Sequence, residues 1–414
     1  MQKITNKIKL PHAILMYAVT SLFLAFEMAL QVSPSIMTHD LIGAFHVDAY
    51  WLGIISGSYF ISYTIMQIPA GILFGYFNTR NVIVIPLILC AIGASLFAIS
   101  NQIIVAIMAR IFMGIGSAFA FISVLVVVAD VFDKKYYGLF TGITQMIAAI
   151  GAMCGQLPLL YLKNLTNWHV VMYVIAMLGI ILAFTVWFVV NYKKCNCYLD
   201  ARANIPDFFR SFFTVIKNPR SWWIALYACC LWAPMSAFAS LWGVPFLEAK
   251  GFSATIATQL VMLMWVGLAI GSPLIGFLSD RFNTRFLFLC LSALIGAIAF
   301  AIILFLPNNS FIITIMILLA GGACAGQALS FAVVSEQNNK ATNAVAISFN
   351  NMAVVISGAL LQPLAGKLIQ SYGHKKLVSD AATYSPNAYK FGLSAILICY
   401  IISFIVSFVL ARRK

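Results

Sequence analysis

Apolar stretches long enough to cross a lipid bilayer recur along the whole of this 414-residue chain. A bilayer core needs about 20 consecutive apolar residues in a helix, because backbone polar groups find no water there and must bond within the segment. The sequence is 63% hydrophobic and 9% charged, whereas about 25% of the residues in soluble domains are charged. A transmembrane β-barrel would show short segments of alternating polarity instead. We therefore expect an all-α polytopic membrane protein.

The apolar stretches number twelve, which predicts two pseudo-symmetric bundles of six transmembrane helices. The longest hydrophilic stretch separates the sixth from the seventh and holds six basic residues, so it indicates a linker. We expect an N-terminal bundle over residues 1–192, a cytoplasmic linker over 193–220 and a C-terminal bundle over 221–414. The predicted spans are 13–35, 49–77, 82–100, 102–130, 137–162, 168–192, 221–247, 254–278, 285–306, 310–336, 342–370 and 389–411.

Basic residues gather in alternate loops, and this predicts the orientation. With both termini inside, the inner segments hold eighteen lysines and arginines and the outer segments hold six. Because these residues accumulate on the cytoplasmic side, we expect both termini in the cytoplasm and the chain in the inner (cytoplasmic) membrane. The net charge of +14 is then a consequence of topology, so nucleic acid is not an expected partner.

No residue pattern predicts an enzyme or a cofactor site. The nine cysteines lie mostly within apolar stretches, which is typical of small core side chains rather than of metal sites or disulfides. We find no activated nucleophile and no phosphate-binding glycine loop followed by a lysine. Neither an enzyme nor an ATP-driven pump is expected, and no cofactor or metal.

One element occurs twice, about half the chain apart. The tetrapeptide Phe-Asn-Thr-Arg occupies residues 77–80 and 282–285, and a glycine precedes each copy at the same distance, Gly71 and Gly276. Such a repeat indicates one membrane unit used twice.

Six plus six helices, a basic central loop and this repeated element resemble the major facilitator superfamily of secondary transporters. The loops after helices two and eight of that superfamily carry a pattern close to G-x-x-x-D-[RK]-x-x-x-[RK], which Gly276, Asp280, Arg281 and Arg285 match. The resemblance covers nearly the whole chain. It implies the major facilitator fold, transport by alternating access, and a small-molecule substrate.

The first copy of the pattern departs from the superfamily. Gly71 and Arg80 match it, but Gly75 stands where the aspartate is expected and Tyr76 where the basic residue is expected. This departure weakens the expected ionic contacts on the N-terminal side.

Each half also carries an acidic residue at the inner end of a neighbouring helix, Asp130 in the first half and Glu336 in the second. The resemblance implies that Arg80 engages Asp130 and that Arg285 engages Glu336, as two equivalent pairs at the cytoplasmic face. Such pairs would hold an inner gate shut while the outer face is open. The alternative is solvated helix-end charges, each contributing about 0–1 kcal/mol.

Two charges inside the spans, Glu27 in the first and Arg110 in the fourth, have no counterpart in the other half. A charge at the bilayer centre costs at least about 2.5–3.5 kcal/mol, so each needs a partner or a wet cavity. Arg110-x-x-x-Gly114-x-Gly116 is similar to the superfamily's fourth-helix motif, whose arginine is linked to proton coupling. In one interpretation the glycines allow close packing and Arg110 is a buried donor. In the other, Glu27 and Arg110 form a charge pair facing the cavity.

Polar residues on other spans are candidates to complete the cavity. Tyr59, Tyr63 and Gln67 recur at i, i+4 and i+8, which places them on one helix face. Helices two and ten commonly line the cavity in the superfamily, so the resemblance favours Tyr59, Tyr63 and Gln327 as substrate-binding residues. Ordinary hydrogen bonding between helices is the alternative.

Two short segments suggest the cargo. Residues 27–48 and 114–121 resemble a proteobacterial branch related to lysosomal dipeptide carriers and to phagosomal nutrient transporters. This resemblance implies amino acids or short peptides, and we expect a monomeric, proton-coupled importer of the symport type. One alternative is a proton-coupled exporter of a metabolite, drug or siderophore. Another is a sensor that uses the same fold without transport.

Overall fold

The computed structural model describes residues 10–133, 137–191, 205–282, 284–306, 309–338, 342–373, 376–378 and 381–412, and these are almost entirely helical. The N-terminal elements are α1 (Leu10–Val32), η1 (Ser33–Ile36), α2 (Thr38–Phe45), α3 (Ala49–Tyr76), α4 (Thr79–Ala98), α5 (Ile103–Ser117), α6 (Ala120–Val131), α7 (Tyr137–Cys154), α8 (Leu157–Leu165) and α9 (Trp168–Val189). The central helix is α10 (Ile205–Lys217). The C-terminal elements are α11 (Pro219–Ala233), η3 (Pro234–Trp242), α12 (Gly243–Ala249), α13 (Ala254–Phe282), α14 (Arg285–Phe305), α15 (Ser310–Cys324), α16 (Gln327–Gln337), α17 (Asn343–Tyr372), β1 (Lys376–Val378), β2 (Ala381–Thr383) and α18 (Pro386–Arg412).

Eleven helical segments of the described chain are long and apolar enough to cross a bilayer, and α3 completes a series of twelve. α3 has 28 residues, but its serine, tyrosine and glutamine side chains make it less apolar than the others. The predicted all-α architecture of twelve spanning helices is therefore confirmed.

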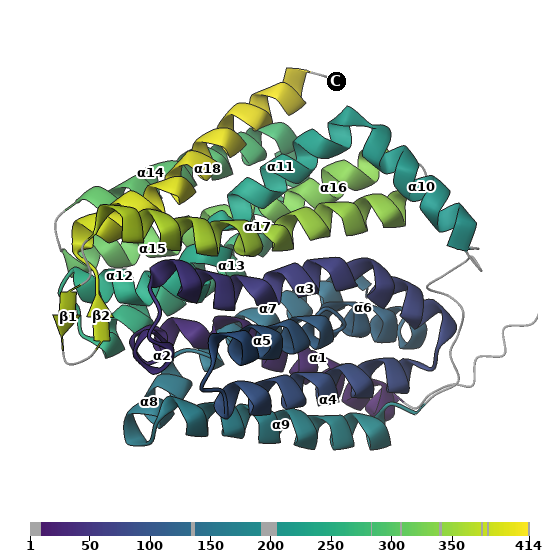
Figure 1. Ribbon diagram of the computed structural model, residues 1–414. Helices are drawn as coiled ribbons and strands as arrows, with labels where there is room; N and C mark the ends of the chain where they lie inside the picture. Colours follow the sequence, from purple (N-terminus) through teal and green to yellow (C-terminus); the bar gives the residue numbers. More distant parts are fainter. Residues whose placement is uncertain are drawn as a thin grey trace, which may run out of the picture.

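The helices form two bundles that lie against each other (Figure 1). The N-terminal bundle, purple to blue, contacts the C-terminal bundle, green to yellow, chiefly where α3 lies beside α17. One end of the assembly carries α2, α8 and the β1–β2 hairpin, and we call it the hairpin face. The opposite end carries α10, and we call it the linker face.

Within the described residues, three spans are broken at or beside a proline, and in the fifth the break between α7 and α8 comes just before Pro158. The first span passes from α1 into the 3₁₀ turn η1, which contains Pro34. The seventh changes from α11 to the π-helix η3 at Pro234. Proline has no N–H, so the carbonyl four residues earlier loses its helical partner. Pro69, Pro273 and Pro363 lie inside continuous helices instead.

Both copies of the repeated tetrapeptide connect one long helix to the next, α3 to α4 and α13 to α14. In the first copy the Asn78 side chain accepts a hydrogen bond of 3.0 Å from the backbone N–H of Arg80, which caps the start of α4. Asn283 in the second copy lies outside the described residues. The repeat thus serves the fold that both halves share.

Two features were not expected from the sequence. The interval predicted as a linker contains the 13-residue helix α10. The loop before the last span contains the antiparallel hairpin β1–β2, with Leu377 opposite Ala382. Their apolar patterns are too short to stand out among twelve longer stretches.

The contact between α3 and α17 depends on glycine. A Cβ added at Gly53 would lie 2.5 Å from the carbonyl oxygen of Gln362, and Gly366 faces the backbone of Ala49 equally closely. Real side chains cannot approach a backbone oxygen so closely, so these glycines let the two bundles meet near the hairpin face. By contrast, a Cβ added at Gly71, further along α3, would meet nothing within 4 Å.

Gly53→Ala and Gly71→Ala form a matched pair on one helix. We expect Gly53→Ala to lower the free energy of unfolding by about 1–3 kcal/mol, because the backbone must move to admit the methyl group. We expect Gly71→Ala to raise it by about 0.5–1 kcal/mol, because alanine favours the helix. Thermal unfolding in detergent measures both, and shifts of the same sign would contradict the close contact.

Candidate functional site

Glu27 lies in the interior of the N-terminal bundle and is bound by a tyrosine. Its residue is 1% exposed, and its Oε1 accepts a hydrogen bond of 2.7 Å from the hydroxyl of Tyr59 on α3. A buried carboxyl group is costly unless it is hydrogen bonded, so Tyr59 stabilises Glu27 within the bundle.

Arg110 on α5 is equally buried and binds the broken part of the first span. Its Nη1 donates a hydrogen bond of 3.0 Å to the carbonyl oxygen of Leu30. In an unbroken helix that carbonyl would accept from the residue at position 34, but Pro34 has no N–H to donate. Pro34 therefore leaves the Leu30 carbonyl oxygen free to accept from Arg110. The hydroxyl of Ser33 donates to the same oxygen at 3.1 Å.

Tyr59 joins the two charged residues. The guanidinium carbon of Arg110 lies 4.6 Å from the centre of the Tyr59 ring, a cation–π contact. None of the ion pairs among the described residues links Glu27 with Arg110 directly. The structure thus shows a cluster of acid, tyrosine and arginine where the sequence suggested a direct charge pair.

Part of the Arg110 guanidinium has no hydrogen-bond partner among the described residues. Its Nε and Nη2 are buried and make no hydrogen bond to the described residues. Buried donors without a partner cost about 1–3 kcal/mol each, and more when charged. These two N–H groups can therefore bind an anionic group that enters the cluster.

Gly114 brings α5 against α3 beside the cluster. A Cβ at Gly114 would clash with the Tyr59 carbonyl oxygen and the Ser62 hydroxyl, and one at Gly116 would clash with the carbonyl oxygen of Pro86. The glycines of the fourth-span motif thus pack closely, while Arg110 one turn earlier faces the cluster.

The other polar candidates differ in how they relate to the cluster. The ring of Tyr63 lies 6.0 Å from that of Tyr59. Gln67, on the same face of α3, accepts a hydrogen bond of 3.0 Å from Asn351 on α17, a contact between the bundles. Gln327 is buried at the start of α16 in the other bundle, and no hydrogen bond of the described residues joins it to the cluster. Its role stays a prediction.

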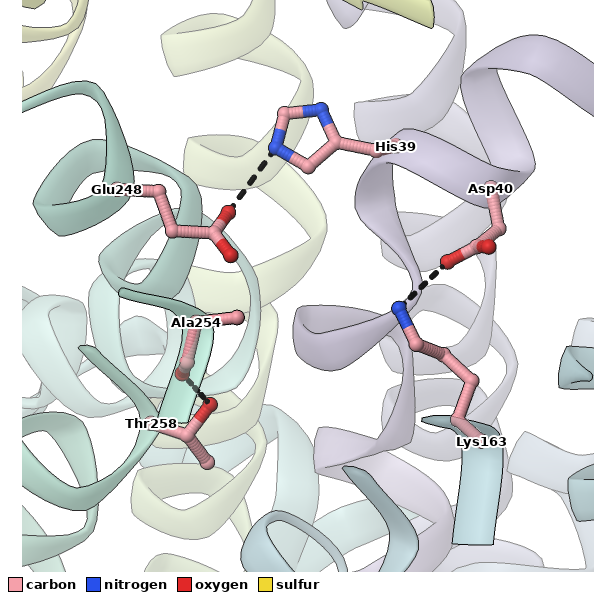
Figure 2. Close-up of polar contacts among 6 residues, drawn as sticks. All are labelled: His39, Asp40, Lys163, Glu248, Ala254 and Thr258. Atoms are coloured by element: carbon pink, nitrogen blue, oxygen red, sulfur yellow. Dashed lines mark hydrogen bonds and ion pairs between the residues drawn. The ribbon is translucent and has the colours of Figure 1, made fainter. Parts of the chain in front are cut away.

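At the hairpin face, a hydrogen bond between side chains joins the two bundles (Figure 2). His39 on α2 lies 3.0 Å from a carboxylate oxygen of Glu248 on α12. The next residue, Asp40, pairs at 2.8 Å with Lys163 on α8 within the N-terminal bundle. Helix α2 is therefore bound to its own bundle through Asp40 and contacts the other bundle through His39.

Further hydrogen bonds between the bundles surround this pair. Gln370 donates to Asp48 at 2.6 Å, and the Tyr384 hydroxyl accepts from the Ala49 N–H at 3.1 Å. Burial and the charge of Asp48 raise the pKa of Tyr384, so its hydroxyl stays neutral. Deeper in, Gln156, the residue before α8, donates at 2.9 Å to the carbonyl oxygen of Ala239 in η3. Together these contacts close the hairpin face.

At the linker face, the C-terminal half contains the predicted ion pair. Arg285 lies 2.6 Å from Glu336 and 3.5 Å from Asp280. Both partners belong to the C-terminal bundle, so the pair fixes α13, α14 and α16 to one another rather than to the opposite bundle. Arg281 is exposed beside them.

The N-terminal half differs at the corresponding place. The guanidinium of Arg80 lies 4.3 Å from the ring centre of Trp187 on α9, and the ion pairs among the described residues include none between Arg80 and Asp130. The loss of the motif aspartate at Gly75 agrees with this asymmetry. Sequence reasoning missed Trp187, because no spacing pattern links the sixth span to the loop after the second.

Sequence reasoning also missed the contacts that close the hairpin face. His39 and Glu248 lie in short segments just outside the predicted spans, and polarity alone does not pair them. Gln31, Gln156 and Gln362 were the available signal, since each is a buried amide inside an apolar stretch.

Comparison with known proteins gives one family and several similar folds. Residues 14–361 match the family model described as Major Facilitator Superfamily. The candidate transporter AraJ of Escherichia coli (strain K12) is 23% identical over 211 residues, which cover 50% of this chain and 50% of AraJ. The chain thus spans about half the length of that curated relative.

Solved structures match over almost the whole length. A bacterial homolog of the human lysosomal transporter Spinster, in an inward-facing and unoccupied conformation, has a TM-score of 0.79 at 17% identity and covers 98% of both chains. The nucleoside transporter NupG has a TM-score of 0.74 at 14% identity, covering 97% of this chain and 98% of its own. At these identities the matches concern the fold, and they confirm the predicted one.

The hydrogen bond to Glu27 predicts a specific loss of stability. We expect Tyr59→Phe to lower the free energy of unfolding by about 1–3 kcal/mol, because a buried carboxyl group then loses its donor. Tyr161→Phe is the control, since Tyr161 is 52% exposed, and it should change stability by less than about 0.5 kcal/mol. Thermal or denaturant unfolding in detergent compares them, and equal stability of the two variants would refute the role of this bond.

Proposed function

This chain belongs to the Major Facilitator Superfamily, and we propose that it imports an amino acid or short peptide together with protons. It is a secondary transporter of a small-molecule substrate and not an enzyme. The observation that carries the proposal is the buried cluster of Glu27, Tyr59 and Arg110.

The cluster has the two charges that a zwitterion needs. A substrate carboxylate would bind Nε and Nη2 of Arg110, the donors without a hydrogen-bond partner among the described residues. A substrate ammonium group would donate a hydrogen bond to a Glu27 oxygen, which a carboxyl group still offers when it is protonated. Exchanging one neutral arrangement for another avoids leaving an unpaired charge in the membrane, which would be costly.

Protons enter this scheme through Glu27. The ionised carboxylate accepts the Tyr59 hydrogen bond, whereas a protonated Glu27 becomes a donor and no longer balances the charge of Arg110. Arg110 would then attract an anionic group more strongly. Proton binding and substrate binding would thus favour each other, which is the requirement for symport.

Alternating access would open the hairpin face and close the linker face. The contacts of His39, Gln370 and Gln156 between the bundles would break as the bundles rock. The Arg285–Glu336 pair lies within one bundle, so we propose that it keeps the loop with Asp280 and Arg281 in place during this motion. We propose the same role, keeping the loop after the second span in place, for Arg80 and Asp130 in the N-terminal half.

The proposal includes orientation and assembly. The distribution of basic residues supports a linker face in the cytoplasm. Both termini would then lie on the cytoplasmic side of the inner membrane. One chain contains both bundles and the complete cluster, which supports a monomer as the transporting unit. Residues 27–48 and 114–121, which resemble carriers of dipeptides and nutrients, support amino acids or short peptides over the alternative of an exported metabolite, drug or siderophore.

Uptake into liposomes tests the role of Glu27. With purified protein, a panel of amino acids and dipeptides, and a medium one pH unit more acidic than the lumen, the wild type should accumulate its substrate by up to about tenfold per coupled proton. Glu27→Gln should abolish accumulation and retain exchange of labelled for unlabelled substrate, because a glutamine carries no titrating proton.

Glu336→Gln is the control, since it removes a carboxylate from the linker face and leaves the cluster unchanged. Glu336→Gln should change the uptake rate by the same factor at every pH, so the pH dependence of the wild type is kept. Uptake by Glu27→Gln that stays fully pH-dependent would show that another group carries the proton, and outward-only transport by the wild type would favour the exporter.

Cross-linking tests the motion at the hairpin face. A short bismaleimide across His39→Cys/Glu248→Cys should stop transport, because it ties the bundles together. The same reagent across Asp40→Cys/Lys163→Cys should leave transport within about twofold of the unmodified variant, because it joins residues of one bundle. Continued transport by the first cross-linked variant would contradict opening at this face.

A further inference from the structure

Helix α10 differs from the other long helices in its direction. It runs across the linker face instead of along the bundles, and it packs against α17 and α11 (Figure 1). From Arg210 to Lys217, the apolar residues Phe212, Phe213, Val215 and Ile216 share one side of the helix. An amphipathic helix in this position lies at the level of the lipid headgroups.

The bundle covers part of the apolar side of α10. Val215 is 1% exposed, and Phe212 is partly buried against the hydrophobic core. Phe213 is 56% exposed. One edge of the apolar side is therefore packed against protein, and the other edge remains outside the bundle.

The outer edge combines an aromatic residue with two basic ones. Phe213 follows Arg210 by three residues and precedes Lys217 by four, so all three share one stripe of the helix. Arg210 and Lys217 are both exposed. A long basic side chain beside an apolar one can extend its charge to water or phosphate while its stem lies on apolar surface.

Trp222 extends the stripe beyond the end of α10. It is 53% exposed, and its indole N–H donates at 2.8 Å to the carbonyl oxygen of Ile216. Its ring also packs edge-on against Phe349 at 5.1 Å. The indole is thus fixed beside α10, and tryptophan is enriched where proteins meet the membrane interface.

We propose that Arg210, Phe213, Lys217 and Trp222 form a binding site for an anionic phospholipid. The phosphate would bind between Arg210 and Lys217, and Phe213 and Trp222 would contact the glycerol backbone and the first acyl carbons. A lipid satisfies both halves of this stripe, because its anionic group and apolar chains lie at adjacent depths. A free phosphate ion would leave the two exposed aromatic rings without a function, so we assign the site to the intact lipid.

Native mass spectrometry of the full-length protein in detergent tests this site, with phosphatidylglycerol as the probe. Arg210→Gln/Lys217→Gln should weaken binding of the tightest phosphatidylglycerol by about 25-fold, since each basic residue near an anionic surface contributes a factor of about five. Phe213→Ser should weaken phosphatidylglycerol binding several-fold, and water-soluble glycerol phosphate should not compete.

Two further variants separate the site from net charge and from folding. Lys367→Gln/Lys390→Gln removes the same charge near the hairpin face and should leave tight binding unchanged. Arg210→Lys/Lys217→Arg keeps both charges and should retain binding within about twofold. Retained binding would show that substitution at these two positions does not disrupt the fold of the segment. Wild-type affinity in Arg210→Gln/Lys217→Gln, equal losses in the hairpin-face control, or full competition by glycerol phosphate would each overturn the proposal.

Discussion

A charged side chain inside a membrane needs a partner, and the N-terminal bundle is arranged around that requirement. Glu27 receives its hydrogen bond from Tyr59, and Arg110 binds a carbonyl oxygen that Pro34 leaves exposed. A helix break in α1, a tyrosine on α3 and an arginine on α5 thus stabilise two charges that would each cost several kcal/mol alone. Close packing at Gly114 places α5 near enough for the arginine to reach them. Any change in the charge of Glu27 must therefore change the contacts of three helices.

A second broken helix lies where the bundles meet. The π-helix η3 begins at Pro234, and the carbonyl oxygen of its Ala239 accepts a hydrogen bond from Gln156 of the opposite bundle. Around it, His39 with Glu248 and Gln370 with Asp48 connect the bundles through polar side chains. Such contacts are individually weak because water can replace them. Because the contacts between the bundles at the hairpin face are of this kind, the two bundles can part there while each keeps its own packing.

Much of the fold followed from the sequence, because hydropathy and charge bias are strong signals in lipid. The spans and the repeat were available from spacing along the chain, and the resemblance to the superfamily implied the Arg285–Glu336 pair. The geometry of the cluster was not, because Tyr59 lies between Glu27 and Arg110 only once three helices are packed. The contact of Arg80 with Trp187 could not be predicted either, because it depends on how α9 packs beside α4. Spacing identifies which polar residues are unusual in a membrane, and packing decides which of them meet.

The central claim is that Glu27 carries the proton that accompanies a zwitterionic substrate. The most direct test is the current produced when that substrate is added at equal pH on both sides to proteoliposomes on a solid-supported membrane. A zwitterion carries no net charge, so the transient current of transport reports protons. We expect a positive inward current for the wild type and none for Glu27→Gln, with substrate binding retained. A current of wild-type size in Glu27→Gln would contradict it.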